Sequence, residues 1–242
     1  MKDDVSRLQF HAQEFADELT ATVQAVSPQC LPFIATSVDK RVVVEQSPNV
    51  GIPLMVSENV LITLKVRFQC RWSDAGEFLT VDSSSISAFA GTSDRQPIFR
   101  NEYERGARTV PAAHLHVHAH RDAFTYTMAK AGMSTARGER RANSDQVPSL
   151  QEIHFPLGGH RFRPSLEDVL EMLIDEFGVD HDESAREKLA QGRERWRLVQ
   201  TRAAVRDAPA TAADTLRDLG YRVELPEGVA APANRRNRLT SP

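Results

Sequence analysis

The sequence is poor in cysteine, lacks a long apolar run and carries little net charge, and each shortage narrows the range of possible functions. Its two cysteines, Cys30 and Cys70, are far apart, which favours reduced core thiols over a disulfide scaffold. No apolar segment approaches the roughly 20 residues needed to span a bilayer. The start of the chain, MKDDVSRLQF, is acidic and amphipathic, unlike a secretory signal. We therefore expect a cytoplasmic protein with no membrane partner.

The charges are nearly balanced, with a formal net charge of -3 in a chain of 242 residues. Overall charge therefore does not predict nucleic-acid or membrane binding, and any such partner would need a local basic patch. The hydrophobic fraction of 40% and the charged fraction of 26% are ordinary for a globular protein that buries a core.

Apolar residues recur with helical spacing near the N-terminus and at every second position further on. The segment from about residue 5 to 26 predicts an amphipathic helix that ends near Pro28. The segment ITLKVRFQCRW (62–72) alternates without interruption, as a half-buried strand does. With similar segments at 41–46, 77–91, 97–104 and 112–121, it predicts an antiparallel sheet of about five strands packed on the N-terminal helix.

The second half of the chain has mainly helical patterns. SLEDVLEMLIDEFG predicts the clearest helix, with Ser165 and Asp168 as a capping box and Gly178 at the end. We expect a short helix in DAFTYTMAKAG, helices near 182–207 and 210–219, a short strand in YRVEL, and a mobile loop in MSTARGERRANSDQVP. The predicted fold is α+β, with a domain at 1–164, a helical region at 165–225 and a disordered basic tail at 226–242.

The segment HLHVHAH (114–120) places four histidines at alternate positions of a predicted strand: His114, His116, His118 and His120. Side chains at alternate strand positions point the same way, so these imidazoles are expected on the outward face, about 6.5–7 Å apart along the strand. Leu115, Val117 and Ala119 would then face the core. A plain polar face of a strand remains an alternative.

A catalytic interpretation of these histidines is that they act on phosphate as acid, base or nucleophile. A free imidazole has a pKa near 6.5 and can accept and donate a proton at cellular pH. The guanidinium group matches the geometry of phosphate. The candidate phosphate-binding residues are Arg67, Arg71, Arg121, Arg161 and Arg163.

A metal site is the second interpretation. Two histidines on one strand can supply two ligands of a zinc ion, and a third can come from another segment. The candidate ligands are His116, His118 and His154, with Gly158 and Gly159 allowing a turn at His160. The sequence offers no evident carboxylate or cysteine to complete the set. A noncatalytic face for nucleic acid or protein is the third interpretation.

Two families share part of this pattern. HLHVHAH is similar to the motif of histidine-triad nucleotide hydrolases and transferases, which implies that His116 attacks an α-phosphate; His120 here replaces an apolar motif position. IFRNEYERGARTVPAAHLHVHAHR resembles TumE-type bacterial toxins, which implies RNA as substrate and an antitoxin as partner. This chain is about twice as long as such toxins. The sequence as a whole also resembles actinobacterial proteins.

Three further features are candidates for a functional role. Glu102 and Glu104 could orient a histidine or pair with arginine. The segment GGHRFRP before the predicted helix at 165 could bind an anion. Arg195, Arg202 and Arg206 form a basic stripe on the predicted helix 182–207, either solvated or in contact with nucleic acid.

The sequence therefore leads to one main hypothesis and two alternatives. The main hypothesis is a phosphodiester- or nucleotide-cleaving hydrolase without a cofactor, in its narrower form a toxin-like ribonuclease. The alternatives are a nonenzymatic nucleic-acid- or protein-binding module and a zinc-dependent hydrolase with histidine ligands.

Overall fold

The computed structural model describes residues 2–38, 41–73, 76, 78–92, 96–106, 112–117, 121–144 and 163–239. The chain divides into two compact units, Met1–Arg193 and Glu194–Pro242, and the division falls within a helix. The clearest predicted helix, after residue 165, shares the core of the first unit, so that unit extends past the predicted boundary at 164.

The first unit is built on an antiparallel sheet of seven strands in the order β1-β2-β4-β5-β6-β7, with β3 paired to β4 beside this path. The α+β class is confirmed, and the expected count of about five strands is two short. The strands are β1 (Phe33–Val38), β2 (Arg41–Gln46), β3 (Ile52–Val56), β4 (Asn59–Trp72), β5 (Leu79–Ala90), β6 (Phe99–Glu104) and β7 (Ala113–Val117).

The two strands that the sequence did not predict, β1 and β3, are short. β3 contains Pro53, which lacks an amide hydrogen and normally argues against a strand. The proline is accommodated because, among the described strands, β3 pairs with β4 alone, where Pro53 lies opposite Thr63. β1 pairs only with β2 and forms an edge of the sheet.

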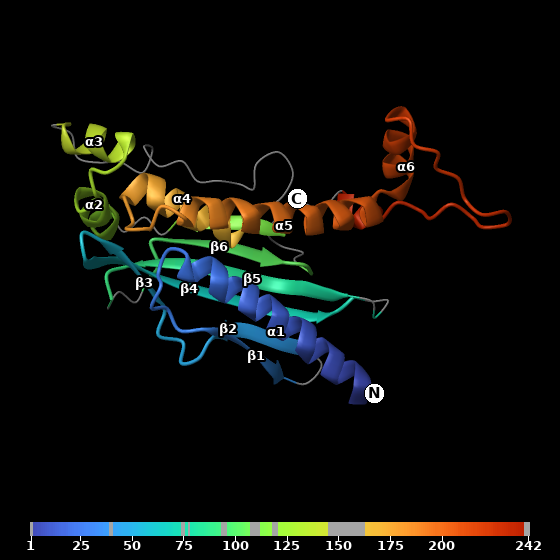
Figure 1. Ribbon diagram of the computed structural model, residues 1–242, viewed down its shortest axis with the longest axis horizontal. Coiled ribbons are helices and arrows are strands. Elements are labelled where there is room, and N and C mark those ends of the chain that lie inside the picture. Colours follow the sequence, from blue (N-terminus) through green and yellow to red (C-terminus); the bar gives the residue numbers. More distant parts are fainter. Residues whose placement is uncertain are drawn as a thin grey trace. The chain divides into compact units, whose positions relative to one another are not determined.

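The N-terminal helix α1 (Lys2–Gln24) covers one face of this sheet, as predicted, and crosses β1, β2 and β4 in Figure 1. Ala12 and Ala16 are fully buried where the helix meets the sheet. Small side chains at these positions let the helix approach the sheet closely. Phe15 contacts Phe68 edge to face, with ring centroids 5.0 Å apart.

The alternation of β4 divides the sheet into a core face and a polar face. Ile62, Leu64, Val66, Phe68 and Cys70 are buried on the core face, as the sequence predicted. Lys65 and Arg67 are exposed on the opposite face. We use polar face for the side of the sheet that carries Lys65, Arg67, Ser85, Ser87, Arg100, Glu102, His114 and His116.

Three helices complete the first unit before the division: α2 (Arg121–Ala129), α3 (Ala136–Ala142) and α4 (Leu166–Phe177). The capping box of Ser165 and Asp168 and the left-handed Gly178 at the end of α4 confirm the predicted helix. The prediction of a mobile loop at MSTARGERRANSDQVP is wrong for its centre. Thr135 caps α3 there by accepting a hydrogen bond of 2.9 Å from the Gly138 amide.

The second unit contains most of α5 (Ala185–Asp207), followed by α6 (Pro209–Asp218) and α7 (Arg236–Leu239). The two longer helices lie close to their predicted ranges. YRVEL does not form a strand: the Tyr221 amide donates to Leu216 and the Val223 carbonyl accepts from Arg217, so both backbone groups are used locally. Arg195, Arg202 and Arg206 are exposed on α5, and a role with nucleic acid stays a prediction.

Among the described residues, no helix has the length and apolar character needed to cross a bilayer. Cys30 and Cys70 are both buried and unpaired, as predicted. Burial raises the pKa of the Cys30 thiol to about 11. Burial, and then the charge of Asp82, raise the pKa of the Cys70 thiol to about 12.

A buried ion pair joins α3 to α4 and gives a first testable prediction. Arg141 Nη1 donates to Glu176 Oε2 at 3.0 Å, and the Glu176 side chain has no exposed surface. Arg141→Met should destabilise the protein by about 3–5 kcal/mol because it removes the Arg141 guanidinium from a fully buried carboxylate. Urea unfolding measures the free energy of unfolding of Arg141→Met. The control is Arg140→Met, which removes the neighbouring exposed arginine. Equal stabilities would contradict it.

The cysteines give a second prediction. With raised pKa values both thiols stay protonated at pH 8, and only the thiolate reacts rapidly with disulfide reagents. Native protein should therefore be labelled slowly at pH 8, whereas protein unfolded in guanidinium should be labelled at both positions at once. Rapid labelling of native protein would show that the thiols are not buried as described.

Candidate functional site

The strand β7 presents two of the four predicted histidines on the polar face of the sheet. His114 and His116 alternate with Leu115, which is partly buried against the core. The predicted side-by-side arrangement is therefore confirmed for these two. His118 and His120 lie outside the described residues, and Arg121 begins α2 instead of extending the strand.

A single carboxylate oxygen contacts both of these histidines. Glu102 on β6 lies opposite His114 in the strand register. Its Oε2 atom is 3.1 Å from His116 Nε2 and 3.5 Å from His114 Nε2. The two imidazole rings meet edge to face with centroids 4.8 Å apart. The three side chains thus form one cluster, which we call the His-Glu cluster.

The cluster is partly open to solvent. The side chain of His114 is 16% exposed, and the side chain of His116 is 44% exposed. A small molecule can therefore approach from the His116 side, while His114 is held more deeply between the strands.

The other oxygen of Glu102 is held by a cation. Arg100 lies two residues earlier on β6, on the same face, and its Nε atom is 3.0 Å from Glu102 Oε1. The carboxylate therefore has an ion-pair contact at each end, with Oε1 beside the guanidinium and Oε2 beside the imidazoles. Such a contact restricts rotation of a ligand carboxylate, as outer-shell partners do in metal sites.

The spacing of the cluster matches what a metal ion requires. One ligand atom from each of Glu102, His114 and His116 can be chosen so that all lie within 4.8 Å of one another. Ligand atoms of a tetrahedral zinc ion, at about 2.0–2.2 Å from the metal, lie about 3.3 Å apart. The two oxygen–nitrogen distances, 3.1 and 3.5 Å, bracket that value. The cluster could therefore hold a metal ion.

Two predicted phosphate-binding arginines are already paired with acids away from the cluster. Arg67 Nε lies 3.4 Å from Glu45, and Arg71 Nε donates to Asp82 at 3.1 Å. Arg67 is on β4, three strands from β7, or about 14 Å at the usual strand spacing. The structure therefore does not bring these two arginines to the histidines.

A third predicted arginine, Arg163, belongs to the other face of the sheet. Its guanidinium lies 3.9 Å from the centroid of the Tyr103 ring, and Tyr103 alternates with Glu102 along β6. Burial lowers the pKa of Arg163 to about 10. The charge of Tyr103 acts to raise this pKa, and the charge of Arg105 acts to lower it further. Arg163 is thus stacked on an aromatic ring away from the His-Glu cluster.

The remaining predicted site residues cannot be placed. His154 and Arg161, together with His118 and His120, lie outside the described residues. The backbone of Arg121 is described but its side chain is not. Their predicted roles stay predictions.

From the sequence, Glu102 was named as a residue that could orient a histidine or pair with arginine, and Arg100 was not named as a site residue. The alternation in FRNEYE places both on the polar face, which was a usable signal. Their partners depend on the pairing of β6 with β7, which the sequence pattern alone does not specify. For this reason the sequence offered no evident carboxylate for the metal ligand set, although Glu102 lies beside both histidines.

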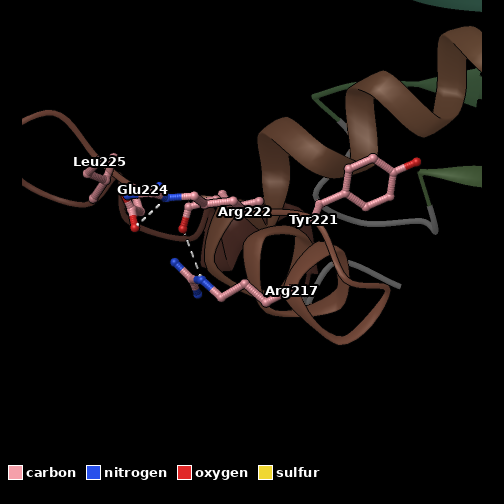
Figure 2. Close-up of a pocket in the computed structure, with 6 residues that line it drawn as sticks. Arg217, Tyr221, Arg222, Glu224 and Leu225 are labelled. Carbon is pink, nitrogen blue, oxygen red and sulfur yellow. Dashed lines mark hydrogen bonds and ion pairs between the residues drawn. The ribbon is translucent and has the colours of Figure 1, made fainter.

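A shallow depression of about 570 Å³ lies elsewhere, in the second unit, and is drawn in Figure 2. It is lined by Arg217, Tyr221, Arg222, Val223, Glu224 and Leu225. Its two arginines are engaged, since Arg217 donates to the Val223 carbonyl and Arg222 to the Glu224 carboxylate. These lining residues include no histidine and one carboxylate, so they do not resemble a catalytic set.

Comparison of the chain with protein-family models, curated proteins and solved structures gave no match. The chemistry of the His-Glu cluster itself is therefore the basis for assigning a function.

The cluster gives a direct metal-binding prediction. Wild-type protein should bind one equivalent of zinc or cobalt(II), and His116→Ala should weaken that binding at least about 100-fold, because a lost ligand costs no less than the roughly 10–100-fold of a lost outer-shell partner. Isothermal titration measures the affinity, and the absorption bands of cobalt(II) report its coordination.

A matched control is available on α1. His11 Nδ1 lies 2.9 Å from Glu14, a histidine–carboxylate pair. His11→Ala should leave zinc affinity unchanged. Equal losses in the two variants would contradict assignment of the metal to the His-Glu cluster.

Proposed function

We propose that the protein is a metal-dependent hydrolase that cleaves phosphodiesters, with zinc held by Glu102, His114 and His116. The observation that carries this proposal is the position of Glu102 Oε2, within 3.5 Å of both imidazole Nε2 atoms. Two histidines and one glutamate are a donor set found in catalytic zinc sites, and the same set also suits iron(II). A zinc ion bound in this way acts as a Lewis acid and activates water.

The residues around the cluster support a hydrolytic role. The exposed side of His116 leaves room for a substrate, and Arg100 places a guanidinium beside it in the strand register. Arg100 and Glu102 form an ion pair at 3.0 Å, which favours one orientation of the carboxylate before a substrate arrives. A fixed positive group next to the site favours substrates with a negatively charged oxygen, such as phosphodiesters.

A metal-free mechanism is the second candidate, and the 3.1 Å contact between Glu102 and His116 favours it. In that mechanism Glu102 orients the imidazole, and His116 exchanges a proton with the substrate as a general acid or base. The two mechanisms use the same residues but differ in their need for a metal.

The decisive experiment measures hydrolysis of bis(4-nitrophenyl) phosphate and of single-stranded RNA by protein loaded with zinc. Activity should disappear after chelation, return with added zinc, and fall at least 100-fold in Glu102→Gln and His116→Ala, the order of effect of a lost acid–base group. His11→Ala should keep full activity. RNA cleavage would also support the narrower proposal of a toxin-like ribonuclease.

Three results would separate the competing proposals. Activity that survives chelation but is lost in His116→Ala supports the metal-free mechanism. Absence of hydrolysis, with RNA affinity that changes when His114 and His116 are replaced, supports the nonenzymatic binding module. Full activity in the double variant His114→Ala/His116→Ala would overturn both hydrolase proposals.

A further inference from the structure

A row of four side chains crosses the polar face at the level of His116. The strand register places Lys65 of β4 opposite Ser87 of β5, Ser87 opposite Arg100 of β6, and Arg100 opposite His116 of β7. Residues that are directly opposite in an antiparallel sheet have neighbouring side chains on the same face. The row therefore leads from β4 to the His-Glu cluster.

The two cations of this row differ in their acidic contacts: Lys65 has none among the described residues, and Arg100 has one. Lys65 is exposed, its Nζ lies 5.4 Å from the Phe89 ring centroid, and within the described part of the chain it pairs with no carboxylate. Arg100 contacts Glu102 through Nε, the one ion pair it makes with described residues. Its terminal guanidinium nitrogens can therefore still bind an anion, as can the ammonium group of Lys65.

The neighbouring rows differ because acids occupy their cations. Arg67 is paired with Glu45, and its row continues through Ser85 to Glu102. Arg71 shares Asp82 with Arg41. An incoming anion would compete with a carboxylate at each of those arginines, and with Glu102 at Arg100, whereas Lys65 pairs with no carboxylate of the described residues.

We propose that Lys65, Ser87 and Arg100 form a phosphate-binding subsite for a phosphate of the substrate that is not the one cleaved. The proposal rests on the phosphodiesterase function proposed above. Ser87 is the short side chain between two long cations; it is 8% exposed, and its Oγ lies 3.3 Å from Ser85 Oγ. Its hydroxyl can accept a hydrogen bond from Ser85 and donate its own hydrogen to a phosphate oxygen held between the two cations. Ser87 lies two strands from His116, about 9.6 Å at the usual spacing.

This separation defines the substrate class. A phosphate above Ser87 is too far from the His-Glu cluster to be the reacting group, so the substrate carries at least two phosphates along a chain. A single-stranded oligonucleotide meets that requirement, whereas a mononucleotide or bis(4-nitrophenyl) phosphate does not. Because the contacts are to phosphate, RNA and DNA should use the subsite equally.

The test compares Lys65→Ala with wild type on oligonucleotides of six residues, RNA and DNA, and on bis(4-nitrophenyl) phosphate. Lys65→Ala should raise KM for the oligonucleotides about fivefold, the upper range for one exposed charge contact, with kcat unchanged. Hydrolysis of bis(4-nitrophenyl) phosphate and zinc affinity should be unaffected. Lys188→Ala, which removes an exposed lysine on α5, is the matched control for net charge.

Binding without turnover provides an independent measurement. Fluorescence anisotropy of a labelled oligonucleotide should show that the slope of log affinity against log salt falls by about 0.7 in Lys65→Ala, as expected for one lost phosphate contact on a single strand. Equal changes in Lys65→Ala and Lys188→Ala, no change in Lys65→Ala, or no oligonucleotide binding by wild type would each overturn the subsite. If this slope falls in protein that neither binds zinc nor hydrolyses phosphodiesters, the subsite stands and the proposed function fails.

Discussion

The register of strands β4 to β7 is the constraint on which the candidate site depends. Side chains alternate between faces, so a slip of one residue in β7 would turn both histidines toward the core and Leu115 toward solvent. The observed pairing is stabilised on the core face, where Val117 lies opposite the buried Phe99. Burial of apolar side chains on one face therefore positions His114 and His116 on the other.

Within that register, Glu102 connects the structural and chemical parts of the site. Its Oε1 atom faces the Arg100 guanidinium and its Oε2 atom faces two imidazoles, so these ion contacts all come from neighbouring strand positions. A side chain held by regular strands is placed more accurately than one on a loop. The same arrangement explains why Arg100 is better placed to assist the cluster than the more distant Arg67.

The sequence predicted those parts of the fold that depend on local patterns. The alternation in β4 and the capping residues of α4 are both contained in short segments, and both were predicted correctly. β3 was missed because Pro53 is tolerated only through its particular pairing with β4. The Glu102 contact was beyond reach for a related reason: it joins residues on two strands whose register no short segment specifies. The acids that occupy Arg67 and Arg71 likewise come from other strands.

The contact between Glu102 and the histidines can serve either proton transfer or metal binding, but not both at the same time. The lone pair on His116 Nε2 can bind a proton, and the resulting N–H then donates a hydrogen bond to the carboxylate. Alternatively, the same lone pair can bind a metal ion that the carboxylate also binds. Proton and metal therefore compete for the same nitrogen, and metal binding must release any proton held there. Metal affinity should consequently fall as the solution becomes more acidic. A metal-free acid–base group instead requires that the same nitrogen remain available to protons, so the metal content of the protein decides between the two mechanisms.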